Sequence, residues 1–96
     1  MKQNIELTGE QKILIDQLPK MDLSSLARVV KNDWKKVYFG AEPYLDAMAT
    51  LGSIKENYGY DSGKSVVIYF LSNATTYRGP IAKAVKAELK KRCGIK

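Results

Sequence analysis

Apolar positions recur at helical spacing along most of this chain, and capping residues mark where the helices begin. Thr8 and Gln11 form a capping box, in which each side chain satisfies the free backbone N–H of the other. A helix is therefore expected from about Gly9 to Leu18. Pro19 ends it, because a proline ring disfavours helical geometry at the preceding residue.

A longer helix is predicted to follow, with Asp22 as its N-cap. Three basic residues, Arg28, Lys31 and Lys35, fall on the side of this helix opposite its apolar face. Gly40 is the expected C-terminal cap. The apolar face of the helix comprises Leu26, Val29, Val30, Trp34 and Val37.

Two prolines mark the start of further helices, because a missing N–H and a fixed φ suit the first helical turn. After Pro43, apolar side chains continue at helical spacing through Leu51 until Gly52. After Pro80, an apolar stripe repeats every four residues and lysines form a separate stripe, until Gly94 ends the helix. The apolar stripe consists of Ile81, Val85 and Leu89.

The segment from Ser65 to Leu71 is β-branched and aromatic throughout, which by propensity alone favours a strand. No other stretch clusters strand-forming residues, and a lone strand would leave its backbone groups unpaired. We therefore interpret the segment as a buried helix capped by Asp61 or Ser62. A second capping box is expected before it, at the residues Ser53 and Glu56.

The predicted fold class is all-α: a compact single-domain bundle of about five short helices over residues 8–96, after a flexible N-terminus at residues 1–7. A chain of 96 residues allows one domain. Its longest apolar run, Val66 to Leu71, has six residues, far short of the roughly 20 that span a bilayer, so no membrane association is expected. A cytoplasmic location is expected, because Met1–Leu7 carries no secretory signal and one cysteine suits a reducing compartment.

The chain contains no histidine, which removes Ser-His and Cys-His catalysis and most transition-metal sites. We therefore expect a protein that is not an enzyme and that uses no cofactor or metal. Cys93 lies on or beside the apolar face of the last helix and is expected to be structural.

The positive charge is concentrated at one end of the chain. The 16 basic and 10 acidic residues give a net charge of +6. Residues 1–77 are neutral, whereas residues 78–96 hold seven basic residues and one acidic residue, a net +6. Such a local field favours an acidic partner, although lysines at a helix end also complement the helix dipole and aid solubility. The candidate binding residues are Arg78, Lys83, Lys86, Lys90, Lys91 and Arg92.

Arg78 and Gly79 precede the start of the last helix, where free backbone N–H groups favour anions. Arg78 could contact a phosphate or carboxylate there, or it could hold the loop by bonding carbonyl oxygens. Tyr58 and Tyr60 could form an aromatic binding surface, with packing as the alternative. Asp33, at the edge of an apolar arc, is expected to assist a neighbouring N–H group or lysine.

Five short stretches of the chain resemble a group of small uncharacterised bacterial, plasmid- or phage-borne proteins. The resemblance implies a compact helical domain without an enzyme signature and an origin in a mobile element, and it assigns no site residue. The stretches are residues 33–37 (DWKKV), 43–48 (PYLDAM), 69–74 (YFLSNA), 78–79 (RG) and 85–89 (VKAEL).

The sequence favours an accessory or regulatory protein that binds another macromolecule, most readily a protein. The alternative is non-specific nucleic-acid binding through the last helix, with Arg28, Lys31 and Lys35 as a second basic stripe. The two stripes must lie on one surface to share a duplex. A homo-oligomer is also open, since the apolar segment 65–71 could be core or dimer seam.

Overall fold

Five helices and one short β-hairpin make up the computed structural model, which describes residues 7–95. The expected all-α class is confirmed. Of the N-terminal stretch predicted to be flexible, 1–7, all but Leu7 lies outside the described residues. The elements are α1 (Gly9–Gln17), a 3₁₀ turn η1 (Leu18–Lys20), α2 (Leu23–Asp33), α3 (Glu42–Met48), β1 (Asn57–Tyr58), β2 (Asp61–Ser62), α4 (Gly63–Ser72) and α5 (Pro80–Cys93).

Short polar side chains begin three of the helices, as the sequence predicts. Thr8 and Gln11 form the capping box of α1, with both hydrogen bonds at 3.0 Å. Asp22 caps α2 by accepting a bond from the Ser25 N–H. Ser62 caps α4 by accepting from the Ser65 N–H at 3.0 Å. These bonds satisfy backbone donors that have no partner inside a helix.

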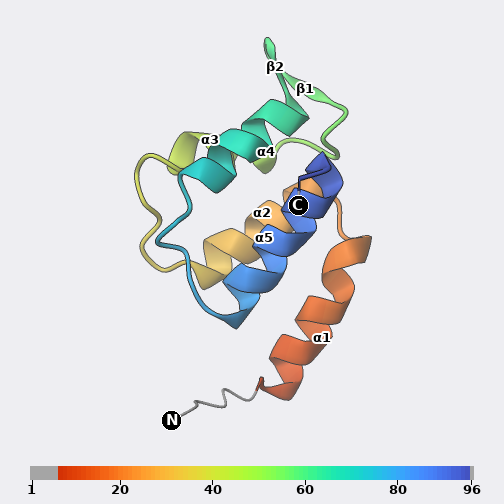
Figure 1. Ribbon diagram of the computed structural model, residues 1–96, viewed down its shortest axis with the longest axis vertical. Helices are drawn as coiled ribbons and strands as arrows, with labels where there is room; N and C mark the ends of the chain where they lie inside the picture. The colour runs from red at the N-terminus through yellow and green to blue at the C-terminus, as the bar shows by residue number, and fades with distance from the viewer. Residues whose placement is uncertain (1–6, 96) are drawn as a thin grey trace.

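The helices pack around one core, with α3 and α4 in one group and α1, α2 and α5 in the other (Figure 1). α3 and α4 lie against each other, and both α2 and α4 contact α5, which runs through the middle of the molecule. α1 lies along the outer side of α5 and buries none of its residues completely. No helix in the described part of the chain is long and apolar enough to cross a membrane. Eight of the fully buried side chains are Leu23, Leu26, Val30, Met48, Val67, Phe70, Val85 and Leu89.

The helix predicted through Val37 ends four residues earlier, at Asp33. Trp34 leaves helical geometry with ψ of 96°, and its ring stacks on Tyr77 at 5.0 Å between ring centroids. Burial of these two rings outweighs the helical periodicity of the sequence, because aromatic side chains bury the largest apolar areas. Gly40 consequently caps no helix; it lies in the connection between α2 and α3.

The prediction of a helix through Leu51 and of a capping box at Ser53 is also corrected. α3 ends at Met48, and residues 49–56 form turns. The Glu56 carboxylate accepts a bond from the N–H of Gly52, at 2.9 Å, rather than from Ser53. Gly52 and Ser53 favour a turn over a continued helix here.

The hairpin of β1 and β2 is the element that sequence analysis missed. It pairs Asn57 with Ser62 and Tyr58 with Asp61, around Gly59 at φ of +62°. Two-residue strands lack the apolar alternation by which strands are recognised. The segment Ser65–Leu71, by contrast, is helical as expected.

Candidate functional site

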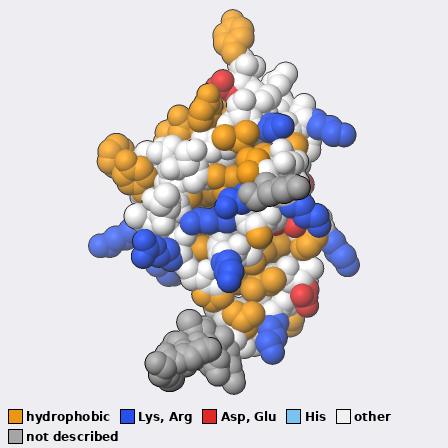
Figure 2. Space-filling model, in the orientation of Figure 1, with side chains coloured by type: hydrophobic (Ala, Val, Ile, Leu, Met, Phe, Trp, Pro, Cys, Tyr) orange, Lys and Arg blue, Asp and Glu red, His pale blue; other side chains and the backbone are white. Residues whose placement is uncertain are grey.

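The cations at the C-terminal end of the chain are of two kinds: some lie along one stripe of α5, and another is bonded within the fold. Lys83, Lys86 and Lys90 follow one stripe of α5, beside the connection that carries Arg78. Figure 2 shows lysine and arginine side chains across the middle of the molecule and at its left edge. Arg92, in contrast, is directed toward α1 and η1 and is partly buried.

Arg92 is a structural residue rather than a free cation. Its Nε donates to the Glu88 carboxylate at 2.8 Å, one turn earlier on α5. Its second nitrogen, Nη2, donates to the carbonyl oxygens of Leu18 and Pro19 at 3.0 and 3.3 Å. The guanidinium thus ties the end of α5 to η1, and few of its donors remain for a ligand.

Lys86 is also partly engaged within the fold. Its Nζ donates to the backbone oxygen of Tyr77 at 2.6 Å and lies 5.7 Å from the centre of that ring. Burial lowers the pKa of Lys86, and the positive charges of Lys90 and Arg78 lower it further. The neighbouring charges are therefore of one sign and repel one another.

An open hollow of about 330 Å³ lies where the 73–79 connection meets α5. Tyr77, Arg78, Gly79, Lys83 and Lys86 line it. The Arg78 Nε reaches the Thr75 carbonyl oxygen only at 3.5 Å, and the side chain is exposed. Arg78 therefore holds the loop only by this one long hydrogen bond. Most of its donors face solvent, which leaves them open to a phosphate or carboxylate.

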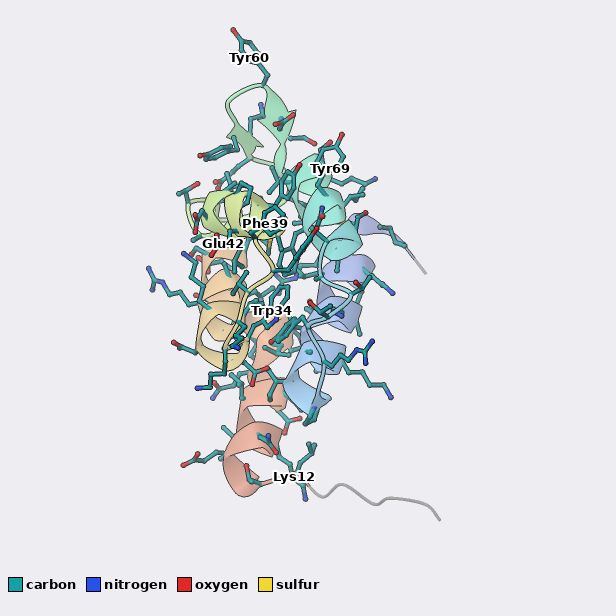
Figure 3. All side chains as sticks on the ribbon, turned by 90° about the vertical axis from the view of Figure 1, so that its left-hand side faces the viewer. Lys12, Trp34, Phe39, Glu42, Tyr60 and Tyr69 are labelled. Atoms are coloured by element: carbon teal, nitrogen blue, oxygen red, sulfur yellow. The ribbon has the colours of Figure 1, made fainter. Side chains whose placement is uncertain are left out.

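The second basic stripe does not join the first. Arg28 and Lys31 lie on α2, but Lys35 follows the end of that helix. Lys31 is bound to Asp46 of α3, with Nζ 3.0 Å from Oδ1. Figure 3 shows α2 on one side of the molecule and α5 on the other, with nitrogen-tipped side chains pointing away on both sides. Arg28 and Lys31 therefore do not form one continuous basic surface with the α5 stripe, whereas Lys35 lies next to Trp34, which stacks on Tyr77.

An exposed aromatic face, comprising Tyr38, Phe39, Tyr44 and Tyr69, is the feature that sequence analysis did not find. The ring centroids of Tyr44 and Tyr69 are 5.5 Å apart, so α3 and α4 each contribute one ring. Those of Tyr38 and Phe39 are 4.9 Å apart, in the connection that precedes α3. Phe39 is 76% exposed.

Asn73 and Gly40 join the two pairs of rings. The Asn73 side chain donates to the carbonyl oxygen of Tyr69 at 2.9 Å. A Cβ atom at Gly40 would lie 3.1 Å from Asn73 Oδ1 and 2.5 Å from Cε2 of Tyr38. The Tyr38 ring thus rests on a backbone that only glycine leaves open, beside the end of α4. The four rings form one surface.

The remaining candidate residues lie apart from this face. Tyr60 is fully exposed at the tip of the hairpin, and Tyr58 is about half exposed on β1. Cys93 is buried, and burial raises the pKa of its thiol by more than the positive charge of Lys64 lowers it. Asp33 accepts a bond from the Tyr77 hydroxyl at 2.9 Å, whereas a lysine or N–H partner was expected. Across residues 7–95, no three Cys, Asp or Glu side chains are grouped to hold a metal ion.

Comparison of the chain with protein-family models, with curated proteins and with solved structures found no match. The candidate site therefore rests on the residues of this chain alone.

Proposed function

We propose that this chain is a non-enzymatic accessory protein that acts by binding another protein through the aromatic face. The observation that carries the proposal is the exposure of Phe39 on a surface that also holds three tyrosines. Folding normally buries such rings, so a group of them at the surface is a common property of binding sites. For such a protein-binding chain we propose the role of a regulator or inhibitor that is carried by a mobile element and acts in the cytoplasm.

The chemistry of the four residues supports a protein partner. Tyrosine supplies a large rigid contact area together with a hydroxyl, and aromatic residues dominate the energy of protein interfaces. The Tyr38 and Tyr69 rings are each nearly half exposed. Each is fixed by a neighbouring ring, so binding costs little conformational entropy.

A crosslinking pull-down from a lysate of the native host tests this function. The wild-type chain is compared with Phe39→Ser, and Tyr60→Ser serves as the matched control because Tyr60 is exposed away from the face. We expect one protein to be retained by the wild-type chain and by Tyr60→Ser, and to be lost with Phe39→Ser. Equal recovery with all three chains, or no protein partner at all, would contradict the proposal.

Nucleic-acid binding through α5 is the second candidate function. Four of the cations, Arg78, Lys83, Lys90 and Lys91, are exposed, and within residues 7–95 none forms an ion pair. Four phosphate contacts on duplex DNA would make log K fall with log salt at a slope of about −4.

Fluorescence anisotropy of labelled duplex DNA and single-stranded RNA, at low and near-physiological salt, tests this second candidate. Micromolar binding that weakens steeply with salt, and is lost when Lys83, Lys86 and Lys90 become Glu, would support it. No binding at low salt would exclude it.

A further inference from the structure

The connection that carries Tyr38 and Phe39 packs against the connection that leads into α5. The connections 34–41 and 73–79 run side by side, because the Trp34 ring stacks on Tyr77 with only 18° between the ring planes (Figure 1). The first connection carries Tyr38 and Phe39. The second ends in Arg78, at the edge of the hollow described above. Gly40 lies beside Asn73 at the other end, so the exposed rings and Arg78 are held along one pair of packed connections.

Positive charges outnumber negative ones along this border. Lys35 and Lys36 immediately precede the aromatic residues of the first connection, and both are exposed. Figure 2 shows basic side chains directly below the hydrophobic side chains that project at the left edge, whereas the visible carboxylates lie at the top and right. Of the nearby acids, Asp33 is bound to the Tyr77 hydroxyl, and Glu42 lies at the start of α3.

We propose that the aromatic face and its basic border bind an acidic polypeptide segment that also carries apolar side chains. The proposal rests on the protein-binding function above and specifies the chemistry of the partner. The apolar side chains of the segment would cover Phe39 and Tyr69, and its carboxylates would face Arg78 and Lys83. Complementary charge at the rim of an apolar contact raises the rate of association and excludes partners of the wrong sign.

The arrangement of the rings favours a polypeptide over single-stranded nucleic acid. Bases bind a protein by stacking one after another on open ring faces. Tyr38 packs over Gly40 and is tilted by 56° against Phe39, and Tyr69 is paired with Tyr44. Phe39 is the one ring of the four that is more than half exposed. An irregular apolar surface of this kind suits side chains of varied shape.

A second copy of this chain does not fit the surface. Each copy has a net charge of +6, so two basic borders would repel each other. Asp46 of α3 is already paired with Lys31, and Glu88 of α5 with Arg92.

Nuclear magnetic resonance titration of the whole labelled chain tests the proposal with defined probes. The first probe is a synthetic peptide in which Asp and Glu alternate with Leu and Phe. The second is the same peptide with Asn and Gln in place of the acids, and the third is an oligothymidylate of matched charge. The variants are Phe39→Ser and the double change Arg78→Glu with Lys83→Glu, all at exposed positions. Tyr60→Ser and Lys12→Glu are the matched controls, because both residues lie away from the face (Figure 3).

We expect the acidic peptide to shift resonances of residues 35–42 and 69–83, and to bind at least tenfold more tightly than the amide peptide. Phe39→Ser and the double charge reversal should each weaken binding about tenfold, a loss of about 1.4 kcal/mol. The control variants should bind as the wild-type chain does.

Three results would overturn the inference: equal affinity for the acidic and amide peptides, shifts confined to other surfaces, or tighter binding of oligothymidylate than of the peptide. Failure of the protein-binding function itself is recognised separately. In that case the crosslinking pull-down recovers no protein, and this result does not depend on the peptides used in the titration.

Discussion

The hydroxyl of Tyr77 donates a hydrogen bond to the Asp33 carboxylate at 2.9 Å, across 44 residues of chain. The same tyrosine stacks on Trp34 and accepts a bond from Lys86 at its backbone oxygen. One residue thus joins the end of α2, the 73–79 connection and α5. Because the connection after Trp34 carries Phe39, this arrangement also positions the aromatic face.

Tyr77→Phe keeps the stacked ring and removes the hydroxyl. A hydrogen bond to a charged group contributes about 1.5–3 kcal/mol, and Asp33 can recover part of that from water because it is exposed. We expect the free energy of unfolding to fall by about 1–2 kcal/mol in urea denaturation. Tyr44→Phe is the control, since its ring is only partly buried. An unchanged midpoint for Tyr77→Phe would show that the bond adds nothing to stability.

The raised pKa of Tyr77 is expected to make the protein less stable in alkaline solution. Burial raises the pKa of Tyr77, and the bond to Asp33 and its negative charge raise it further. A group whose pKa is raised by folding stabilises the protein below its unfolded pKa, and this contribution is lost as pH rises toward the folded pKa. Above about pH 10, where an unfolded tyrosine ionises, the free energy of unfolding should fall by up to about 1.4 kcal/mol per pH unit.

Urea denaturation between about pH 8 and 11 measures this dependence. Above about pH 10, the free energy of unfolding should fall less steeply with pH in Tyr77→Phe than in the wild-type chain. The reason is that the two chains differ only in the ionisable hydroxyl of Tyr77. Parallel profiles would show that Tyr77 ionises equally in the folded and unfolded states.

Gly63 is expected to tolerate no side chain. A Cβ atom there would lie 2.8 Å from the Ser53 carbonyl oxygen and 2.9 Å from the Cα of Ile54, both backbone atoms that cannot move aside. Gly63→Ala should therefore reduce the free energy of unfolding by about 1–3 kcal/mol. Gly9→Ala is the matched control, because a Cβ at Gly9 meets nothing within 4 Å.

Thermal and urea unfolding of both alanine variants check this prediction. Gly9→Ala should leave stability unchanged or raise it by up to about 1 kcal/mol, through the smaller entropy of the unfolded chain. A loss at Gly9 equal to that at Gly63 would mean that close approach of the backbone is not the cause.

Arg92 and Lys90 lie two residues apart on α5 and should differ in their effect on stability. Arg92→Ala removes the pair with Glu88 and the bonds to Leu18 and Pro19, so we expect a loss of about 2 kcal/mol. Lys90 is exposed, and Lys90→Ala should change the free energy of unfolding by no more than about 0.5 kcal/mol. Equal effects in chemical denaturation would contradict the structural role of Arg92.

Local chemistry made much of the fold predictable. Capping bonds depend on residues three apart, so the starts of α1 and α2 follow directly from Thr8 and Asp22. For α4 the sequence left Asp61 and Ser62 as alternatives, and Ser62 is the cap. Pro80 and Gly94 likewise mark the ends of α5, with Gly94 in the left-handed conformation. The helix over Ser65–Leu71 was predictable because a lone strand has no partner.

Long-range contacts account for what the sequence did not reveal. α2 ends at Asp33 because Trp34 packs on a residue more than 40 positions away, and periodicity carries no information about such a contact. Arg92 was predicted as a candidate binding residue, and its bonds to Leu18 and Pro19 in η1 could not be seen from the sequence. The aromatic face combines rings from one connection and two helices. Its one local signal was the pair Tyr38–Phe39 beside Gly40.

Site-specific photo-crosslinking tests the central claim, a protein partner at the aromatic face, most directly. Benzoylphenylalanine replaces Phe39 in one chain and Tyr60 in another, and both are irradiated in cells of the native host. We predict a discrete protein adduct from position 39 and none from position 60. Adducts to nucleic acid, equal adducts from both positions, or no adduct from position 39 would contradict the account.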